Sequence, residues 1–102
     1  MDYQVLMQHY DSRERKEFEI SVATLRRYGA QEIYIFGSMA RGGFDENSDW
    51  DFAVRGITPA DGLRAQGILL SILSRPIDLV DLDNDPEFAS HLQQKEDCIR
   101  VA

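Results

Sequence analysis

The sequence predicts a small domain of the α/β or α+β class, built around a short sheet. Segments rich in β-branched and aromatic residues alternate with longer segments in which apolar residues recur every three or four positions. Their order along the chain is helix, strand, turn, strand, helix, strand and helix, which is typical of a layered fold. At 102 residues the chain has the length of one domain, so residues 1–102 are expected to form a single unit.

The first predicted elements are a helix over residues 12–28 and a strand over residues 32–36. Ser12 can cap the helix, and Gly29 stands where a left-handed residue commonly ends one. The apolar stripe of this helix is formed by Phe18, Val22 and Leu25. Residues 3–9 are a candidate for a shorter helix before it.

A glycine-rich turn follows the strand. The run EIYIF ends at Gly37 and Ser38, the residues SMAR can form one helical turn, and Gly42 and Gly43 break it. After the loop FDENS, the segment DWDFAV at residues 49–54 alternates polar and apolar residues. This alternation predicts a second strand.

Two carboxylates lie one residue apart at the start of this second strand. Because successive side chains of a strand point to opposite faces, Asp49 and Asp51 are expected on one face, about 6–7 Å apart at Cα. The residues facing the core would be Trp50, Phe52 and Val54. Carboxylates this close repel each other unless a cation compensates, and Mg²⁺ prefers oxygen ligands. The pair predicts a site for magnesium ions, two of which could activate an attacking oxygen and stabilise a leaving one. A solvated strand face is the alternative.

Thr58 and Pro59 predict the start of the next helix, over residues 58–74, with Thr58 as the cap and proline at the first helical position. Its buried face is expected to consist of Leu63, Ile68, Leu69, Ile72 and Leu73. A third strand is predicted over residues 76–82, and a last helix from Asp85 onward. That helix is expected to contain Phe88, Ala89, Leu92 and Ile99.

A third carboxylate is expected near the first two. The helix over residues 58–74 is long enough to cross the sheet and return the third strand beside the second. Asp78 could then bridge metal ions or serve as a general base. Asp81 points to the opposite face, and it is the alternative because the sequence leaves the register of the strand open.

The turn between the first two strands is suited to phosphate. Glycine at position 37 lets the backbone approach a phosphate closely, and N–H groups at a helix start attract anions. The Ser38 hydroxyl can donate to a phosphate oxygen, and Arg41 lies about one turn further on. Anion-binding groups beside cation-binding carboxylates are what a nucleoside triphosphate with Mg²⁺ requires. Taken alone, the same residues would more often be a plain turn and a surface charge.

Charge and composition argue against several classes of protein. The chain has 18 acidic and 11 basic residues, a net charge of −7, and no basic stripe, so polymeric DNA or RNA is a disfavoured substrate. No segment approaches the roughly 20 apolar residues of a membrane span, and no signal-peptide pattern opens the chain. The one cysteine permits no internal disulfide and fits a reducing compartment. We expect a soluble cytoplasmic protein.

The motif of the turn and second strand resembles the signature of the polymerase-β-like nucleotidyltransferase superfamily. The likeness is greatest to the minimal nucleotidyltransferases, the MNT partners in prokaryotic HEPN–MNT toxin–antitoxin pairs. It extends to the order of elements over roughly residues 12–100. The matching string is Gly37-Ser38-x-Ala40-Arg41-Gly42, five residues, then Ser48-Asp49-x-Asp51.

This resemblance implies a small mixed sheet with helices packed mainly on one face. It implies that Gly37 and Ser38 contact the triphosphate, that Asp49 and Asp51 bind Mg²⁺, and that Asp78 is the third acidic residue. The implied reaction transfers a nucleoside monophosphate from a nucleoside triphosphate to a hydroxyl. In MNT antitoxins the nucleotide is AMP from ATP, and the acceptor is a tyrosine of the HEPN toxin.

Larger relatives have a second domain that helps hold the acceptor, and this chain departs from them in having none. This departure favours a protein acceptor over a small molecule. Two further hypotheses remain. One is a binding module of the same fold that masks a toxin without using nucleotide. The other is a nucleotidyltransferase with another acceptor.

Overall fold

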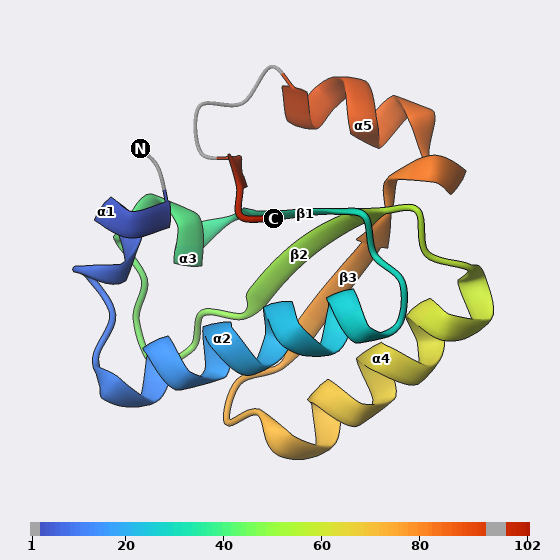
Figure 1. Cartoon of the computed structure of the whole chain (residues 1–102). Helices are drawn as coiled ribbons and strands as arrows, with labels where there is room; N and C mark the ends of the chain where they lie inside the picture. Colours follow the sequence, from blue (N-terminus) through green and yellow to red (C-terminus); the bar gives the residue numbers. More distant parts are fainter. Residues whose placement is uncertain (1–2, 94–97) are drawn as a thin grey trace.

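The computed structural model describes residues 3–93 and 98–102, and a four-stranded sheet lies at its centre (Figure 1). The strands occur in the spatial order β3-β2-β1-β4. Their bounds are β1 Glu32–Phe36, β2 Trp50–Arg55, β3 Ile77–Asp81 and β4 Ile99–Arg100. β2 and β3 pair in parallel, whereas β1 pairs antiparallel with both β2 and β4. The sheet is therefore mixed, which confirms the predicted fold class.

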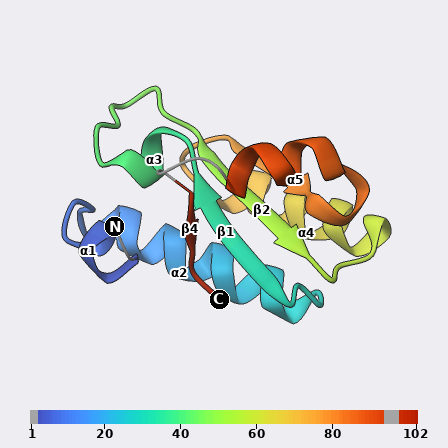
Figure 2. The ribbon, with the colours of Figure 1, turned by 90° about the horizontal axis from the view of Figure 1, so that it is seen from above.

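The two long helices cover one face of the sheet, and a shorter helix covers part of the other. Figure 1 shows α2 and α4 below the strands and α5 above them; Figure 2 shows the same layers from the α5 side. The helices are α1 Tyr3–Met7, α2 Ser12–Arg27, α3 Ser38–Arg41, α4 Pro59–Ile72 and α5 Pro86–Gln93, with a 3₁₀ turn at Leu82–Asn84. α3 follows directly at the end of the sheet where β1 stops (Figure 1).

The alternation of β2 divides the core between the two layers. Trp50, Phe52 and Val54 are fully buried in the larger cluster, together with Phe18 and Leu25 of α2. This arrangement confirms the predicted core face of the strand. The other face of β2 contributes to a smaller cluster formed by Ala53, Leu82, Ala89 and Leu92. Asp51 belongs to this second face, which α5 covers only in part.

A buried carboxylate connects α2 to the sheet. The Trp50 indole Nε1 donates to Glu17 Oε1 at 3.2 Å, and the Ser74 backbone N–H donates to both Glu17 oxygens at 3.1 and 3.2 Å. Arg13 Nε lies 3.7 Å from Glu17 Oε2. Hydrogen bonds to an ionised group are stronger than neutral ones. Glu17 therefore joins α2, β2 and the turn between α4 and β3.

The N-terminal cap of α2 is Asp11 and not Ser12. Glu14 N–H donates to Asp11 Oδ1 at 2.8 Å, and Asp11 N–H donates to Glu14 Oε1 at 2.9 Å. This reciprocal pair is a capping box, which satisfies two backbone donors at once, so it displaces the cap one residue toward the N-terminus. The predicted glycine end is present, because Gly29 adopts a φ of 108° after α2.

The prediction of which residues form the buried face of α4 is largely wrong. Leu69 is buried and Leu73 partly buried, as predicted, but Leu63 is 72% exposed and Ile72 is 54% exposed, and Ile68 is also exposed. The reason is the helix period, because Ala65 and Leu69 lie one turn apart on the covered side, and Leu63 lies about 200° around the helix from Ala65. The predicted cap is correct, since the Thr58 hydroxyl accepts a hydrogen bond from Asp61 N–H at 3.1 Å.

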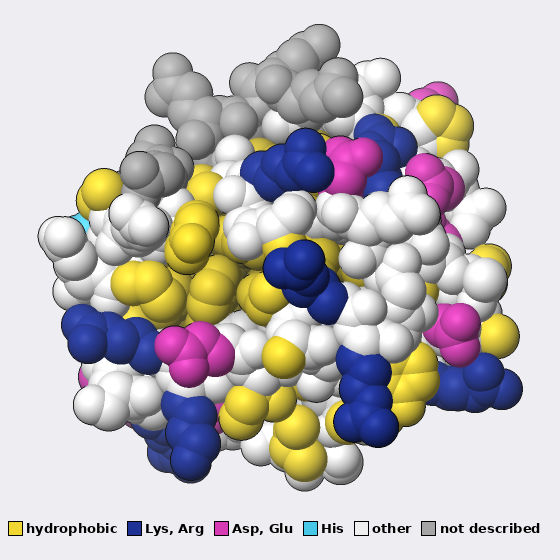
Figure 3. Space-filling model, viewed as in Figure 1, with side chains coloured by type: hydrophobic (Ala, Val, Ile, Leu, Met, Phe, Trp, Pro, Cys, Tyr) yellow, Lys and Arg dark blue, Asp and Glu magenta, His cyan; other side chains and the backbone are white. Residues whose placement is uncertain are grey.

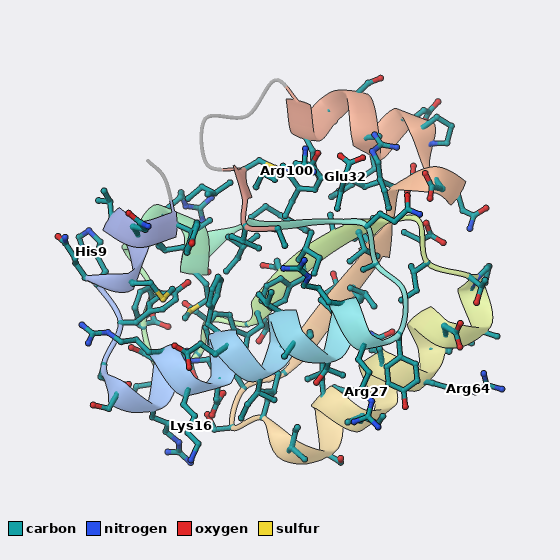
Figure 4. The ribbon with its side chains drawn as sticks, in the orientation of Figure 1. His9, Lys16, Arg27, Glu32, Arg64 and Arg100 are labelled. Carbon is teal, nitrogen blue, oxygen red and sulfur yellow. The ribbon has the colours of Figure 1, made fainter. Side chains whose placement is uncertain are left out.

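Ile99 does not belong to the last helix, as the sequence had suggested. It lies in β4, where it pairs with Ile35 of β1, while residues 94–97 lie outside the described part of the chain. Figure 4 shows Glu32 and Arg100 reaching toward each other from β1 and β4, with 3.9 Å between Glu32 Oε1 and Arg100 Nη1. A two-residue strand of this kind has no periodicity, so it is recognisable only from its partner.

Charged side chains of both signs are mixed with apolar ones on the surface shown in Figure 3. On the face seen in Figure 3, the Lys and Arg side chains are separated from one another by acidic, apolar and other side chains, so they form no continuous basic patch there. Within residues 3–93 and 98–102, no helix combines the length and apolar character needed to cross a bilayer.

Replacing Glu17 should destabilise the fold. Glu17→Ala leaves the buried Trp50 indole N–H and the partly buried Ser74 backbone N–H without their acceptor, so we expect a loss of about 2–3 kcal/mol in the free energy of unfolding. Glu19→Ala is the matched control on the exposed side of the same helix, with an expected effect within about 0.5 kcal/mol. Urea unfolding measures both, and equal midpoints for the two variants would contradict the role of Glu17.

Candidate active site

The parallel pairing of β2 with β3 brings two carboxylates together. Asp51 and Asp78 are Cα partners in this pairing, so their side chains leave the same face of adjacent strands, which lie about 4.8 Å apart. On its other side, Asp51 pairs with Phe36, the last residue of β1. Asp51 therefore stands at the sheet edge where β1 ends and β3 begins.

Asp49 and Arg41 also act on the Asp51 carboxyl. The pKa of Asp51 is raised to about 6, mainly by burial and then by the Asp78 and Asp49 carboxylates, while the Arg41 guanidinium partly offsets the rise. Asp49 is exposed and precedes β2, which begins at Trp50, one residue later than predicted. Three of the other predicted site residues thus influence the Asp51 carboxyl group.

Gly37 brings the glycine-rich turn directly against Asp51. Its backbone angles, φ 72° and ψ −158°, belong to a region essentially restricted to glycine. A Cβ at this position would collide with Asp51 Oδ2 and would lie 3.1 Å from Asp51 Cγ. The turn can approach the carboxylate only without a side chain here. Ser38 follows at the start of α3, so the predicted phosphate-binding and carboxylate groups are neighbours.

A residue that the sequence did not single out supports this turn. The buried Tyr10 hydroxyl donates to the Met39 carbonyl of α3 at 2.8 Å. Burial, with the nearby Glu14 carboxylate, raises the pKa of Tyr10, so the hydroxyl keeps the proton that it donates. Tyr10 lies between α1 and α2, outside any periodic segment, so no sequence pattern marks it.

Asp81, the alternative third carboxylate, has a different position. It pairs with Val54 toward the far end of β2. It accepts hydrogen bonds from Asp83 N–H at 3.1 Å and from Asn84 Nδ2 at 2.6 Å, and so caps the 3₁₀ turn after β3. The register thus brings Asp78, and not Asp81, beside Asp51.

The donor set of this edge fits a hard divalent cation. Its ligands would be carboxylate oxygens, and their mutual repulsion, which contributes to the raised pKa of Asp51, is what a cation relieves. Among the residues that the structure describes, no three His, Cys, Asp or Glu side chains converge closely enough to hold a metal by themselves. Further oxygen ligands would have to come from water and substrate phosphates, as is usual for Mg²⁺.

Comparison with known proteins identifies the family. The family model described as "Polymerase beta, Nucleotidyltransferase" matches residues 19–100, and the chain therefore belongs to this nucleotidyltransferase family. No curated protein matches the sequence significantly.

Solved structures with the same fold include toxin–antitoxin complexes. A chain in a toxin–antitoxin structure with AMP-PNP is 33% identical over 64% of this chain and 56% of that chain, with a TM-score of 0.56. This chain thus spans little more than half the length of that relative. A chain from the complex of the tri-AMPylated Shewanella oneidensis HEPN toxin with an MNT antitoxin is 27% identical over 81% of this chain and 65% of that chain, with a TM-score of 0.55. A structure provisionally assigned as a minimal nucleotidyltransferase covers 100% of this chain and 96% of its own, with 25% identity and a TM-score of 0.67.

Gly37→Ala should disrupt the site and the fold around it. The glycine-only backbone angles and the collision with Asp51 together predict a loss of about 2–3 kcal/mol in the free energy of unfolding. Gly43→Ala is the control, because a Cβ there meets nothing within 4 Å and the backbone φ is ordinary. Thermal or urea unfolding compares the two, and an equally stable Gly37→Ala variant would contradict the tight approach.

Asp51→Asn should stabilise the metal-free protein at neutral pH. Because the pKa of Asp51 is raised from 3.8 to about 6, the folded state holds this proton more tightly than the unfolded chain. The resulting stability is fully present below about pH 4 and is lost as the pH rises through about 6. Screening at this partly exposed carboxylate reduces the expected gain for Asn at pH 7 to about 1 kcal/mol.

Urea unfolding in EDTA tests this expectation at about pH 7.5 and again at about pH 4. The variant should have the higher midpoint at neutral pH, and the difference should disappear in acid. Glu46→Gln, at an exposed position in the loop before β2, should match the wild-type protein at both values. A difference between Asp51→Asn and wild type that is independent of pH would refute the electrostatic explanation.

Proposed function

We propose that this protein is a Mg²⁺-dependent nucleotidyltransferase that transfers AMP from ATP to a tyrosine hydroxyl of a HEPN toxin and thereby neutralises it. The main support is the meeting of Asp51, Asp78 and the Gly37 turn at one sheet edge in a chain of the nucleotidyltransferase family. AMP-PNP in one related structure and the AMPylated HEPN toxin in another support the nucleotide and the acceptor. We assign residues 1–102 to one minimal nucleotidyltransferase domain, acting in the cytoplasm.

Each residue of the edge has a distinct role in this proposal. Asp49 and Asp51 would hold Mg²⁺, and Asp78 would complete the acidic set as a further ligand or as the general base. Bound there, Mg²⁺ supplies the positive charge that stabilises the transferring phosphate and the leaving pyrophosphate. The Gly37 backbone and the Ser38 hydroxyl hold the triphosphate.

The reaction exchanges one phosphorus–oxygen bond for another. The tyrosine oxygen attacks the α-phosphorus of ATP, and the bond from that phosphorus to the oxygen bridging to the β-phosphate breaks. Pyrophosphate leaves, and the tyrosine proton passes to Asp78 or to water. Arg41, whose charge already acts on Asp51, can offset negative charge on the triphosphate.

The exposure of the edge favours a large acceptor. Asp49 and Asp78 are both exposed, so a tyrosine on the surface of another protein can reach the carboxylates without entering a closed pocket. Exposed apolar side chains on α4, among them Leu63 and Leu70, favour association with a protein as well. They also support a second candidate function, in which the chain masks the toxin by binding alone.

Labelled ATP distinguishes these functions. The protein and its candidate toxin are incubated with Mg²⁺ and ATP labelled at the α- or the γ-phosphate, and label on the toxin is measured. We expect label from the α-position only, none in EDTA, and a loss of at least about 100-fold in Asp49→Asn and Asp51→Asn. Glu46→Gln, at an exposed position outside the carboxylate edge, should transfer normally.

The other outcomes are equally informative. Label from the γ-position would show that the protein transfers the γ-phosphate, as a kinase does, and not a nucleotide. If neither position labelled the toxin but a stable complex still protected against it, the result would support masking of the toxin by binding alone. Unchanged transfer in both aspartate variants would refute the assigned site.

A further inference from the structure

The loop that leads to Asp49 is held by a residue from a distant part of the chain. Arg75, in the turn between α4 and β3, donates through Nη1 to the carbonyls of Asp45 at 2.6 Å and Ser48 at 2.9 Å. Its Nη2 donates to Glu14 Oε2 at 2.9 Å. The side chains of Arg75 and Glu14 are only 14% and 13% exposed, so this ion pair is well shielded from water.

The segment that Arg75 binds, residues 45–48, is itself a turn closed by hydrogen bonds. Asp45 N–H donates to Ser48 Oγ at 3.0 Å, Ser48 N–H donates to the Asp45 carbonyl at 3.2 Å, and Asn47 N–H donates to Asp45 Oδ1 at 2.8 Å. Arg75 therefore binds both ends of a preformed unit. The Arg75 Cζ also lies 5.6 Å from the centre of the Phe44 ring, at the start of the same loop.

The residues on either side of Arg75 hold the chain beyond Asp49. Trp50 N–H donates to the Pro76 carbonyl at 2.9 Å, and the Trp50 indole shares Glu17 with the Ser74 N–H. Ser48 and Trp50, the two neighbours of Asp49, are thus both bound to the segment 74–76. Asp49 is positioned by its neighbours on both sides.

We propose that Arg75 is a positioning residue for metal binding and transfer, because it sets the place of Asp49 relative to Asp51. This proposal rests on the proposed function. The role requires arginine, because a planar fork can donate to two carbonyls and a carboxylate together, whereas lysine is a point charge on a flexible stem. Removing the fork should loosen the 45–49 loop while the Glu17 contacts continue to hold β2.

The test compares Arg75→Lys and Arg75→Ala with Arg64→Ala. Arg64 is the control because its side chain is 68% exposed and contacts only Asp61, within α4, among the interactions of the described residues; Figure 4 shows it on the outer side of α4. Two properties are measured: the Mg²⁺ concentration for half-maximal AMP transfer, and Mn²⁺ binding followed by electron paramagnetic resonance without nucleotide or toxin.

For Arg75→Lys, we expect a cooperatively folded protein in which both metal constants rise about 10–100-fold, as is typical when groups that orient metal ligands are lost. Saturating Mg²⁺ should restore much of the transfer rate. Added methylguanidinium should partly restore metal binding in Arg75→Ala and leave Asp49→Asn unchanged. Arg64→Ala should match wild type throughout.

Wild-type metal constants in folded Arg75→Lys would overturn the proposal. It would also fail if Arg75→Ala lost metal binding only in proportion to its unfolded fraction, without rescue by methylguanidinium, since that result describes a purely structural role. Failure of the proposed function is distinguishable, because wild-type protein would then transfer no AMP, while Mn²⁺ binding would still compare the variants. If wild-type protein bound no Mn²⁺, the positioning role would fall as well.

Discussion

The parallel pairing of β2 with β3 is the constraint on which the site depends. It sets Asp51 opposite Asp78, and the same register sends Trp50, Phe52 and Val54 into the core beneath α2 and α4. A shift by one residue would exchange the two faces, burying the carboxylates and exposing the aromatic residues. The hydrophobic core therefore enforces an electrostatically unfavourable arrangement, because the apolar area buried on one face of β2 outweighs the repulsion between carboxylates on the other.

The same edge also explains why glycine and aspartate occur together in the motif. β1 runs antiparallel to β2, so its last residue Phe36 lies beside Asp51, and the chain must turn away at once. Only a residue without a side chain fits there, because the Asp51 carboxylate occupies the space that a Cβ would need. A backbone suited to phosphate and a carboxylate suited to a cation are thereby brought into contact by one packing requirement. The repulsion among the carboxylates lowers the stability of the metal-free fold, which is a common feature of functional sites.

Most of this arrangement could be predicted from local patterns, and the rest depends on tertiary contacts. The period of β2 predicted which side chains face the core, and Thr58-Pro59 predicted the start of α4. The choice between Asp78 and Asp81 could not be made, because register depends on how the crossover helix packs. α4 was misjudged because its apolar residues surround the helix, and small Ala65 occupies the buried side. β4 was missed because a strand of two residues is too short to show an alternating pattern. Its conformation depends on pairing with the free edge of β1.

The polar residues that the sequence patterns missed lie behind the carboxylates of the site and hold the segments that carry them. Glu17 lies one residue before Phe18 on the apolar side of α2, which was a detectable anomaly, since a carboxylate there needs donors. Its donors come from Trp50 and Ser74, and the next residue, Arg75, binds the loop before Asp49. Glu14 unites the two features, since one carboxylate oxygen completes the capping box of α2 while the other accepts from Arg75. The start of α2 is therefore connected through Arg75 to the loop that leads to the exposed carboxylate of Asp49. Between Gly37 and Asp49 the chain closes a turn at residues 45–48, and the carbonyls of Asp45 and Ser48 both accept from the Arg75 guanidinium.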